Sequence, residues 1–305
     1  MKEFFEYREA IVSFIDILGF KDIVANKTAL DVYDICQLFR SQYQTPDLTN
    51  AQERSGIQRQ HEVHFFSDSV VRIKYVDDID TDTAFNPETE EVMSLALMQY
   101  RLIREGVLVR GGVCRGKIFS DPSQNVLFGP ALIDAYKLEN TLAVNPRIII
   151  TKEIWRGLIS DMFSSYFWVR KDSSGNSWQN LIKNMPNFDE PWWINYFWGT
   201  FCNGFTNILE AIALYHAPEI MQKNMLEPLV CEQLLILDEI GTKFVQKPFV
   251  NERIKAKYAW IYDLISETIK DIHAVIYNYE KNHLLTEETR ERLQHAASCH
   301  QGLNE

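Results

Sequence analysis

Short apolar runs alternate with stretches of helical periodicity along the first half of the chain. Residues 11–15 form a short run of β-branched and aromatic side chains, and Gly19 closes the apolar segment, which predicts a buried strand. Between residues 20 and 39, apolar positions recur at helical spacing and predict one amphipathic helix or two short ones. The chain therefore opens with a strand, a glycine turn and a helix.

Two more apolar runs lie within 63–75, on either side of a Ser-Asp-Ser triplet centred on Asp68. They predict a β-hairpin with Asp68 at its tip. The acidic segment 77–90 predicts a solvated connector, and residues 92–105 predict a helix that Gly106 ends.

Residues 107–119 return to strand character, although this run also contains three glycines and two arginines. Glycine within a strand marks a bulge, or a place where a ligand or another backbone comes close. A helix with proline in its first turn follows over 129–140, and residues 146–151 predict another buried strand. Taken in order, these elements predict an α+β fold, with a mixed α/β sheet covered by helices.

The pattern weakens beyond residue 152. It still predicts a hairpin over 166–182, an aromatic-rich core or interface segment over 186–201, and long helices over 218–245 and 251–282. We expect residues 1–182 to form the core domain, and residues 183–305 to pack on it without forming an independent domain.

Composition narrows the class of protein. The 305 residues are 46% hydrophobic, enough for one large or two modest domains, and the net charge of -11 argues against a nucleic-acid partner. The five cysteines form no CxxC pair, so neither a disulfide framework nor a zinc site is expected. The sequence also lacks a signal-peptide core and an apolar run of membrane-spanning length. We therefore expect a cytoplasmic protein with no membrane partner.

Two aspartates are candidates for binding a metal ion. Asp16 lies in an apolar run, where a carboxylate needs an ion pair, hydrogen bonds or a metal ion to offset its burial. Asp68 lies at the tip of the predicted hairpin. Two carboxylates at strand edges suit hard divalent cations, which prefer oxygen ligands. The alternative is that Asp16 caps the following helix and Asp68 is an ordinary turn residue.

Other residues are candidates for binding an anion. Arg110 and Arg115 flank glycines in the strand 107–119, where they face an anionic ligand or serve as edge-strand charges. The turn between the first strand and helix offers free backbone N–H groups to a phosphate. The residues of that turn are Ile17, Leu18, Gly19 and Phe20.

Five segments together resemble a known family. They are FIDILGF, FFSDSVV, VRGGVCRG, FGPALIDAYKLE and PRIIIT, in this order. The set resembles the catalytic domain of class III nucleotidyl cyclases, and in detail the bacterial pyrimidine cyclases of the Pycsar antiphage systems. The resemblance covers roughly residues 8–182 and implies that this part of the chain is a cyclase catalytic core.

The resemblance implies a metal-dependent reaction. Asp16 and Asp68 would bind metal together with the Ile17 backbone carbonyl, in a site for two Mg²⁺ or Mn²⁺ ions about 3.5 to 4 Å apart. The ribose 3′-hydroxyl of a nucleoside triphosphate would attack the α-phosphorus, and pyrophosphate would leave. Members of the family are homodimers with sites at the subunit interface, where one chain supplies the carboxylates and the other supplies helix residues.

Two departures from the purine cyclases bear on the base. The lysine that reads the purine in adenylyl cyclases is His64 here, and the aspartate that assists it is Val126. Purine recognition of the usual kind is therefore unsupported. A smaller base would be read by His64, which can donate or accept a hydrogen bond, with Arg110 near the base or the phosphates.

Two further departures concern transition-state stabilisation. The family's helix asparagine and arginine correspond to Ile133 and Lys137. Lys137 keeps the positive charge, whereas Ile133 cannot replace an amide, so Arg110 or Arg115 would have to supply the missing stabilisation.

The expected function is a uridylate cyclase that converts UTP to 3′,5′-cyclic UMP and pyrophosphate, a second messenger of antiphage defence that acts on a separate effector protein. A cytidylate cyclase acting on CTP is the close alternative. The alternative from a different functional class is a catalytically inactive cyclase-like module that binds a nucleotide or a protein.

Overall fold

The computed structural model describes residues 6–44, 62–76, 86–160, 182–183, 192–194, 196–197, 236–237, 239–243, 255–266, 268 and 287. The chain divides into two compact units, Met1–Tyr196 and Phe197–Glu305. The sequence placed the end of the core at residue 182, whereas strands at 182–183 and 192–194 still belong to the sheet of the first unit.

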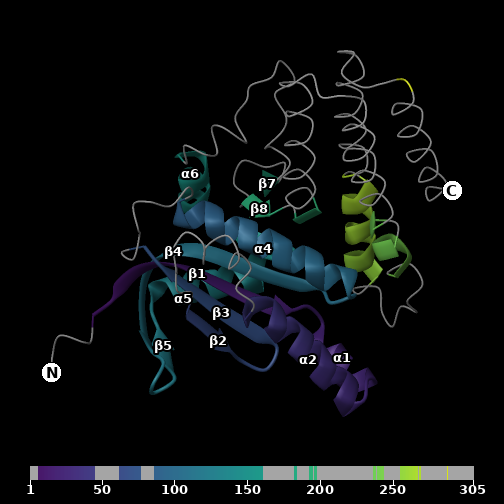
Figure 1. Ribbon diagram of the computed structural model, residues 1–305, viewed down its shortest axis with the longest axis horizontal. Helices are drawn as coiled ribbons and strands as arrows, with labels where there is room; N and C mark the ends of the chain where they lie inside the picture. Colours follow the sequence, from purple (N-terminus) through teal and green to yellow (C-terminus); the bar gives the residue numbers. More distant parts are fainter. Residues whose placement is uncertain are drawn as a thin grey trace. The chain divides into compact units, whose positions relative to one another are not determined.

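The first unit is built on a mixed sheet with helices (Figure 1), so the α+β prediction is confirmed. Its elements are β1 (Arg8–Ile17), α1 (Phe20–Asn26), α2 (Ala29–Gln44), β2 (Glu62–Phe65), β3 (Ser69–Tyr75), α4 (Pro87–Arg104), β4 (Val109–Asp121), β5 (Val126–Phe128), α5 (Pro130–Lys137), the π-helical turn η1 (Leu138–Leu142), β6 (Ile148–Ile150), α6 (Lys152–Ser160), β7 (Ile182–Lys183) and β8 (Trp192–Ile194).

The strands follow the order β2-β3-β1-β4-β6-β8-β7, and β5 pairs with β4. Over β1 to β4 this is the split βαβ arrangement, in which a β-α-β-β-α-β chain forms an antiparallel sheet. Because β3 and β4 both run antiparallel to β1, the end of β1 lies between the beginnings of β3 and β4. Asp16 is consequently paired with Ser69 on one side and with Arg110 on the other.

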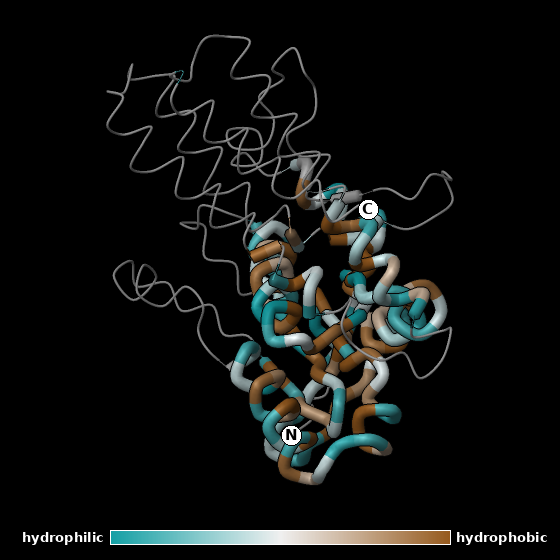
Figure 2. Tube along the Cα trace, turned by 90° about the vertical axis from the view of Figure 1, so that its right-hand side faces the viewer, coloured by the Kyte–Doolittle hydropathy of each residue, from teal (hydrophilic) through white to brown (hydrophobic). Residues whose placement is uncertain are grey.

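The two faces of the sheet carry different helices. Val12 faces a core with Ala131 and Ala135 of α5, whereas the hydroxyl of Ser13, its neighbour on the opposite face, donates to Glu91 of α4 at 2.7 Å. Figure 1 shows α4 lying along one side of the sheet. In the tube of Figure 2, hydrophobic and hydrophilic positions alternate over short distances, as expected for elements with one buried face.

The paired glycines of β4 are sites of close backbone approach, as the sequence predicted. A Cβ on Gly111 would lie 2.6 Å from the Phe14 carbonyl oxygen, and a Cβ on Gly112 would collide with the Ala135 carbonyl oxygen. Gly111 therefore lets β4 lie against β1, and Gly112 lets the end of α5 approach β4.

The expected acidic connector is wrong over its last residues. Helix α4 begins at Pro87, and the side chain of its N-cap, Asn86, accepts a hydrogen bond from the Thr89 N–H at 2.8 Å. Asparagine followed by proline is a strong helix start, and it overrides the acidic composition of the segment. Glu88 and Glu91 are buried rather than solvated. Residues 77–85 lie outside the described part of the chain.

In the second unit, the described residues 236–237, 239–243 and 255–266 are helical, in agreement with the helices predicted there. Gly241 lies close to the side chains of Tyr262 and Ile265, so the two helical segments pack together. The hairpin expected over 166–182 falls outside the described residues except for Ile182, which begins β7, and so do the remaining parts of the two long helices except for the helical Thr268. In the described part of the chain, no helix has the length and apolar character needed to cross a membrane.

Candidate active site

Asp16 and Asp68 lie together at one end of the central strands of the sheet. Asp16 is the penultimate residue of β1, and the N–H of the next residue, Ile17, donates to the Asp68 carbonyl oxygen at 2.9 Å. The Ser67 hydroxyl donates to the Asp68 carboxylate at 2.7 Å. Sheet pairing therefore brings together the two carboxylates that the sequence singled out, although residues 16 and 68 are 52 positions apart in the chain.

Arg110 belongs to the same site. It is the direct partner of Asp16 in the register of β1 and β4, so both side chains project from the same face of the sheet. Its Nη2 lies 3.5 Å from Asp16 Oδ2 and 2.6 Å from Glu139 Oε1. The sequence predicted that Arg110 faces an anionic ligand, which stays a prediction; within this chain Arg110 lies beside Asp16, and its nearer partner is a glutamate.

Glu139 is the site residue that the sequence argument missed. It lies in η1, directly after α5, and only 3% of its side chain is exposed. A signal was present, because Ala131 and Ala135 are buried in α5 and Glu139 continues their spacing of four residues. An acid that continues a buried helical stripe is expected to have a cationic partner.

Among the described residues, the acidic groups that act on Asp16 outnumber the cations. Burial raises the pKa of Asp16 to about 7, with further contributions from Glu139 and Asp68, while Arg110 acts in the opposite direction. Burial also raises the pKa of Glu139; Arg110 opposes this shift and Asp68 adds to it. Asp16 and Glu139 thus share the Arg110 guanidinium while Asp68 adds a third negative charge, and a bound divalent cation would offset this excess.

The donor set suits a hard cation. Asp16, Asp68 and the Ile17 carbonyl all offer oxygen, the ligand that Mg²⁺ and Mn²⁺ prefer. Within the described ranges, no group of three or more His, Cys, Asp or Glu side chains is placed to hold a metal ion. The expected ligands are two such side chains, Asp16 and Asp68, and the Ile17 backbone carbonyl. That these three groups bind a metal ion stays a prediction.

The expected phosphate turn is only partly available. The Ile17 N–H is bonded to Asp68, and the Leu18 N–H donates to the Leu108 carbonyl oxygen at 2.8 Å, so these two amides are used by the fold. The expectation that they bind phosphate is wrong, because the ends of β1 and β4 extend their pairing through them. Phosphate binding stays a prediction for Gly19, which is the N-cap of α1 and has a φ of 79°, and for Phe20.

Arg115 lies away from this site. It pairs with Ile11, which projects from the face opposite Asp16, and its guanidinium contacts Glu88 at 2.7 Å and Glu9 at 3.4 Å. Within one chain, the expectation that Arg115 binds the same ligand as Asp16 is therefore wrong. An odd number of positions separates Arg110 from Arg115, so the pleat of β4 directs them to opposite faces.

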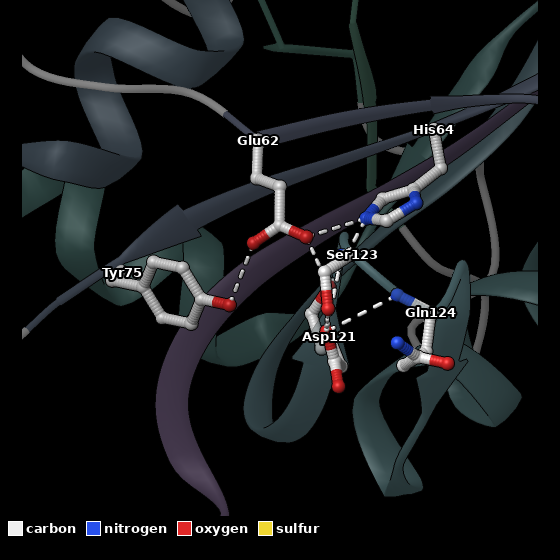
Figure 3. A network of polar contacts seen from close by, with 7 residues as sticks. Glu62, His64, Tyr75, Asp121, Ser123 and Gln124 are labelled. Atoms are coloured by element: carbon white, nitrogen blue, oxygen red, sulfur yellow. Dashed lines mark hydrogen bonds and ion pairs between the residues drawn. The ribbon is translucent and has the colours of Figure 1, made fainter. Parts of the chain in front are cut away.

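His64 lies on the Asp16 face but is already engaged (Figure 3). Its Nε2 lies 2.5 Å from Glu62 Oε1 and 3.1 Å from Ser120 Oγ, and Ser120 also donates to Glu62. The Tyr75 hydroxyl donates to the other oxygen of the Glu62 carboxylate at 2.9 Å. The network links β2 and β3 to the end of β4, so contact between His64 and a base requires Nδ1.

Lys137, the helix residue expected to act in catalysis, faces solvent, as does Ile133. Lys137 is 65% exposed, with its Nζ 3.5 Å from Asp134 Oδ1, and Ile133 is 54% exposed. Within one chain, the structure does not bring Lys137 to the aspartates. Other large apolar side chains exposed on the same part of the chain are Val126, Phe128, Tyr136, Leu142 and Val144.

A scan of protein-family models gives no match to this chain, and a search of curated proteins gives no significant match.

Proposed function

We propose that the protein is a metal-dependent pyrimidine nucleotide cyclase that resembles class III nucleotidyl cyclases and converts UTP to 3′,5′-cyclic UMP and pyrophosphate. The observation that carries this proposal is that Asp16 and Asp68 lie together beside Arg110, in a site where burial, with a smaller contribution from the neighbouring acids, raises the pKa of Asp16 to about 7. The strand order supports the proposal, because the pairing of β3 and β4 with β1 brings these residues, which are distant in sequence, to the same end of the three strands.

Each residue has a role in this proposal. Asp16, Asp68 and the Ile17 carbonyl would hold Mg²⁺ or Mn²⁺, two ions per site, and the bound cations would lower the pKa of the ribose 3′-hydroxyl and neutralise the triphosphate. Arg110 would donate to the phosphate oxygens on which charge develops. The 3′-oxygen forms a bond to the α-phosphorus, the bond from that phosphorus to the bridging oxygen breaks, the electron pair leaves with pyrophosphate, and the hydroxyl proton passes to water.

The same proposal includes a homodimer with shared sites. Lys137 is exposed rather than directed at the carboxylates of its own chain, as a residue donated to a partner's site would be. Ile133, Tyr136 and Phe128, in α5 and the strand before it, are also exposed and offer apolar surface suited to an interface. We propose that the cyclic nucleotide acts in the cytoplasm on a separate effector protein in antiphage defence.

The decisive experiment is incubation of the purified protein with ATP, GTP, CTP and UTP in separate reactions containing Mn²⁺, followed by chromatography with mass detection. Cyclic UMP is expected from UTP, and the matched Asp68→Ala variant is expected to give none. Cyclic CMP alone would identify the cytidylate cyclase instead. A purine product would contradict the choice of pyrimidine base.

One observation favours the alternative from another class. Ile133 occupies the position where the resemblance expects a transition-state amide, and an isoleucine side chain offers no hydrogen bond to phosphate. If no nucleotide yields a product while UTP still binds, the chain is a nucleotide-binding module with a cyclase-like core. Binding of UTP is measured by calorimetry on the same preparation.

His64 provides a test of base recognition. Replacement of His64 by alanine is expected to reduce the preference for the favoured pyrimidine by about tenfold or more, because a hydrogen bond to a buried polar group discriminates strongly between bases. The measurement is the ratio of kcat/KM values for UTP and CTP. Ser120→Ala is the matched control, since it alters the same network without removing the ring. An unchanged ratio in the His64 variant would remove His64 from base recognition.

A further inference from the structure

We propose that Glu139 is a positioning residue that draws Arg110 towards itself, weakens the contact of Arg110 with Asp16 and so keeps the Asp16 carboxylate available to a divalent cation. The inference rests on the metal site proposed above. It assigns a role to a buried acid outside the expected set of ligands.

The position of Glu139 is fixed by the way η1 follows α5. The Ala143 N–H donates to the Leu138 carbonyl oxygen at 3.0 Å, which closes the wider π-helical turn. The missing side chain of Gly112 lets the end of α5 lie against β4. Because Arg110 precedes Gly112 by two positions and shares its face, the same approach brings Glu139 to the guanidinium.

The guanidinium is shared unequally between two acids. One nitrogen, Nη2, is 2.6 Å from Glu139 and 3.5 Å from Asp16, so the closer ion pair is with Glu139. Arginine stays protonated in proteins, so its charge must be balanced within the site. A guanidinium in close contact with Asp16 would occupy a carboxylate oxygen that a metal ion needs and would repel that ion.

Replacement of Glu139 by glutamine removes the negative charge that balances Arg110 and preserves the size of the side chain. Arg110 is then expected to move to Asp16, its remaining nearby acid. Binding of Mn²⁺ should weaken by about tenfold or more, because the cation must compete with the guanidinium for the same carboxylate.

The test is a double-mutant cycle of Mn²⁺ affinity, measured by electron paramagnetic resonance on the wild type, E139Q, R110Q and E139Q/R110Q. Because Glu139 acts through Arg110, the tenfold loss should shrink to about twofold or less when Arg110 is already glutamine. An equal loss in both backgrounds would overturn the proposal, since Glu139 would then act by its own charge. No loss in either background would overturn it as well.

Glu88→Gln is the matched control. Glu88 is also buried and lies 2.7 Å from an arginine, Arg115, but on the opposite face of the sheet. This variant should bind Mn²⁺ like the wild type, which separates a local effect at the site from the general cost of breaking a glutamate–arginine pair. Unfolding midpoints of all variants identify any that fail to fold.

A crystal structure of metal-free E139Q tests the inference independently of metal affinity. The separation of Arg110 Nη2 and Asp16 Oδ2, which is 3.5 Å in the wild type, should shorten to about 2.8 Å, the usual length of a charged hydrogen bond. A separation that stays at the wild-type value would overturn the proposal. The proposed function fails differently, because it depends on cyclic product in the nucleotide assay of the wild type. A wild type that binds Mn²⁺ and shows the coupling but makes no product would refute the cyclase and leave the role of Glu139 intact.

Discussion

Replacement of Asp16 by asparagine is expected to abolish product formation while making the metal-free protein more stable above pH 7. The loss of a metal-binding carboxylate removes several kcal/mol of transition-state stabilisation, so turnover should fall by roughly 10³-fold or more. The gain in stability follows from the same carboxylate, because its charge is unfavourable in a partly buried site with two other acids.

The direction of the pH dependence follows from the raised pKa. The ordinary pKa of an aspartate is 3.8, and folding raises that of Asp16 to about 7. The folded protein therefore binds this proton more tightly, and the resulting stabilisation is complete below pH 3.8 and lost as the pH rises through 7. Above that pH, Asp16→Asn should raise the free energy of unfolding by about 2–4 kcal/mol, after allowance for solvent screening and the lost contact with Arg110.

Urea unfolding of the metal-free proteins between pH 5 and pH 8.5 provides the measurement. The stability of the variant relative to the wild type should grow over this range. Asp31→Asn is the control with the opposite sign, because hydrogen bonds from Thr28 lower the pKa of the exposed Asp31 carboxyl. That variant should lose stability at neutral pH, since the favourable bonds are made by the charged form.

Addition of Mn²⁺ should reverse the order of the two proteins. The metal is expected to raise the unfolding midpoint of the wild type and to leave that of Asp16→Asn almost unchanged, because a ligand stabilises only the folded state that binds it. Equal stabilisation of both proteins by Mn²⁺, or product formation by the variant, would contradict the assignment of Asp16 as a metal ligand.

The sequence predicted the two aspartates because each interrupts an apolar pattern at a strand end. Asp16 and Asp68 were identifiable without coordinates, and the hairpin and first strand that hold them are confirmed. The alternation of side chains along a strand also predicts the face of the sheet on which Arg115 lies. The odd spacing between Arg110 and Arg115 along one strand directs them to opposite faces, and applying this rule would have removed Arg115 from the site.

The other differences between the predicted site and the structure arise from contacts between residues that are far apart in the sequence. The Leu18 amide was expected to be free at a turn, but pairing with Leu108, a residue far along the chain, uses it. The contact of Glu139 with Arg110 depends on how closely η1 approaches β4. Local periodicity identifies which residues are buried but does not specify the residue that each meets across the core, and these two contacts are of that kind.

The largest loss of stability is expected from breaking the ion pair beneath α4. Arg72 of β3 and Glu91 of α4 are almost fully buried, and Arg72 Nη2 lies 3.0 Å from Glu91 Oε2. Ser13 donates to the other oxygen of Glu91, and Met98 lies beside the guanidinium. Replacement of Glu91 by leucine leaves the arginine charge buried without this partner, which should lower the free energy of unfolding by about 3–5 kcal/mol.

The double variant Arg72→Met/Glu91→Leu separates the cost of an unpaired charge from the value of the pair. Two apolar side chains of similar volume avoid desolvation of both charges, so the double variant should regain most of the stability lost by Glu91→Leu. Urea unfolding of the two variants is the measurement. Asp134→Asn, which breaks the exposed contact with Lys137, should cost about 0.5 kcal/mol or less. A double variant as unstable as the single one would mean that the Arg72–Glu91 pair itself, rather than protection from an unpaired charge, stabilises the contact between α4 and the sheet.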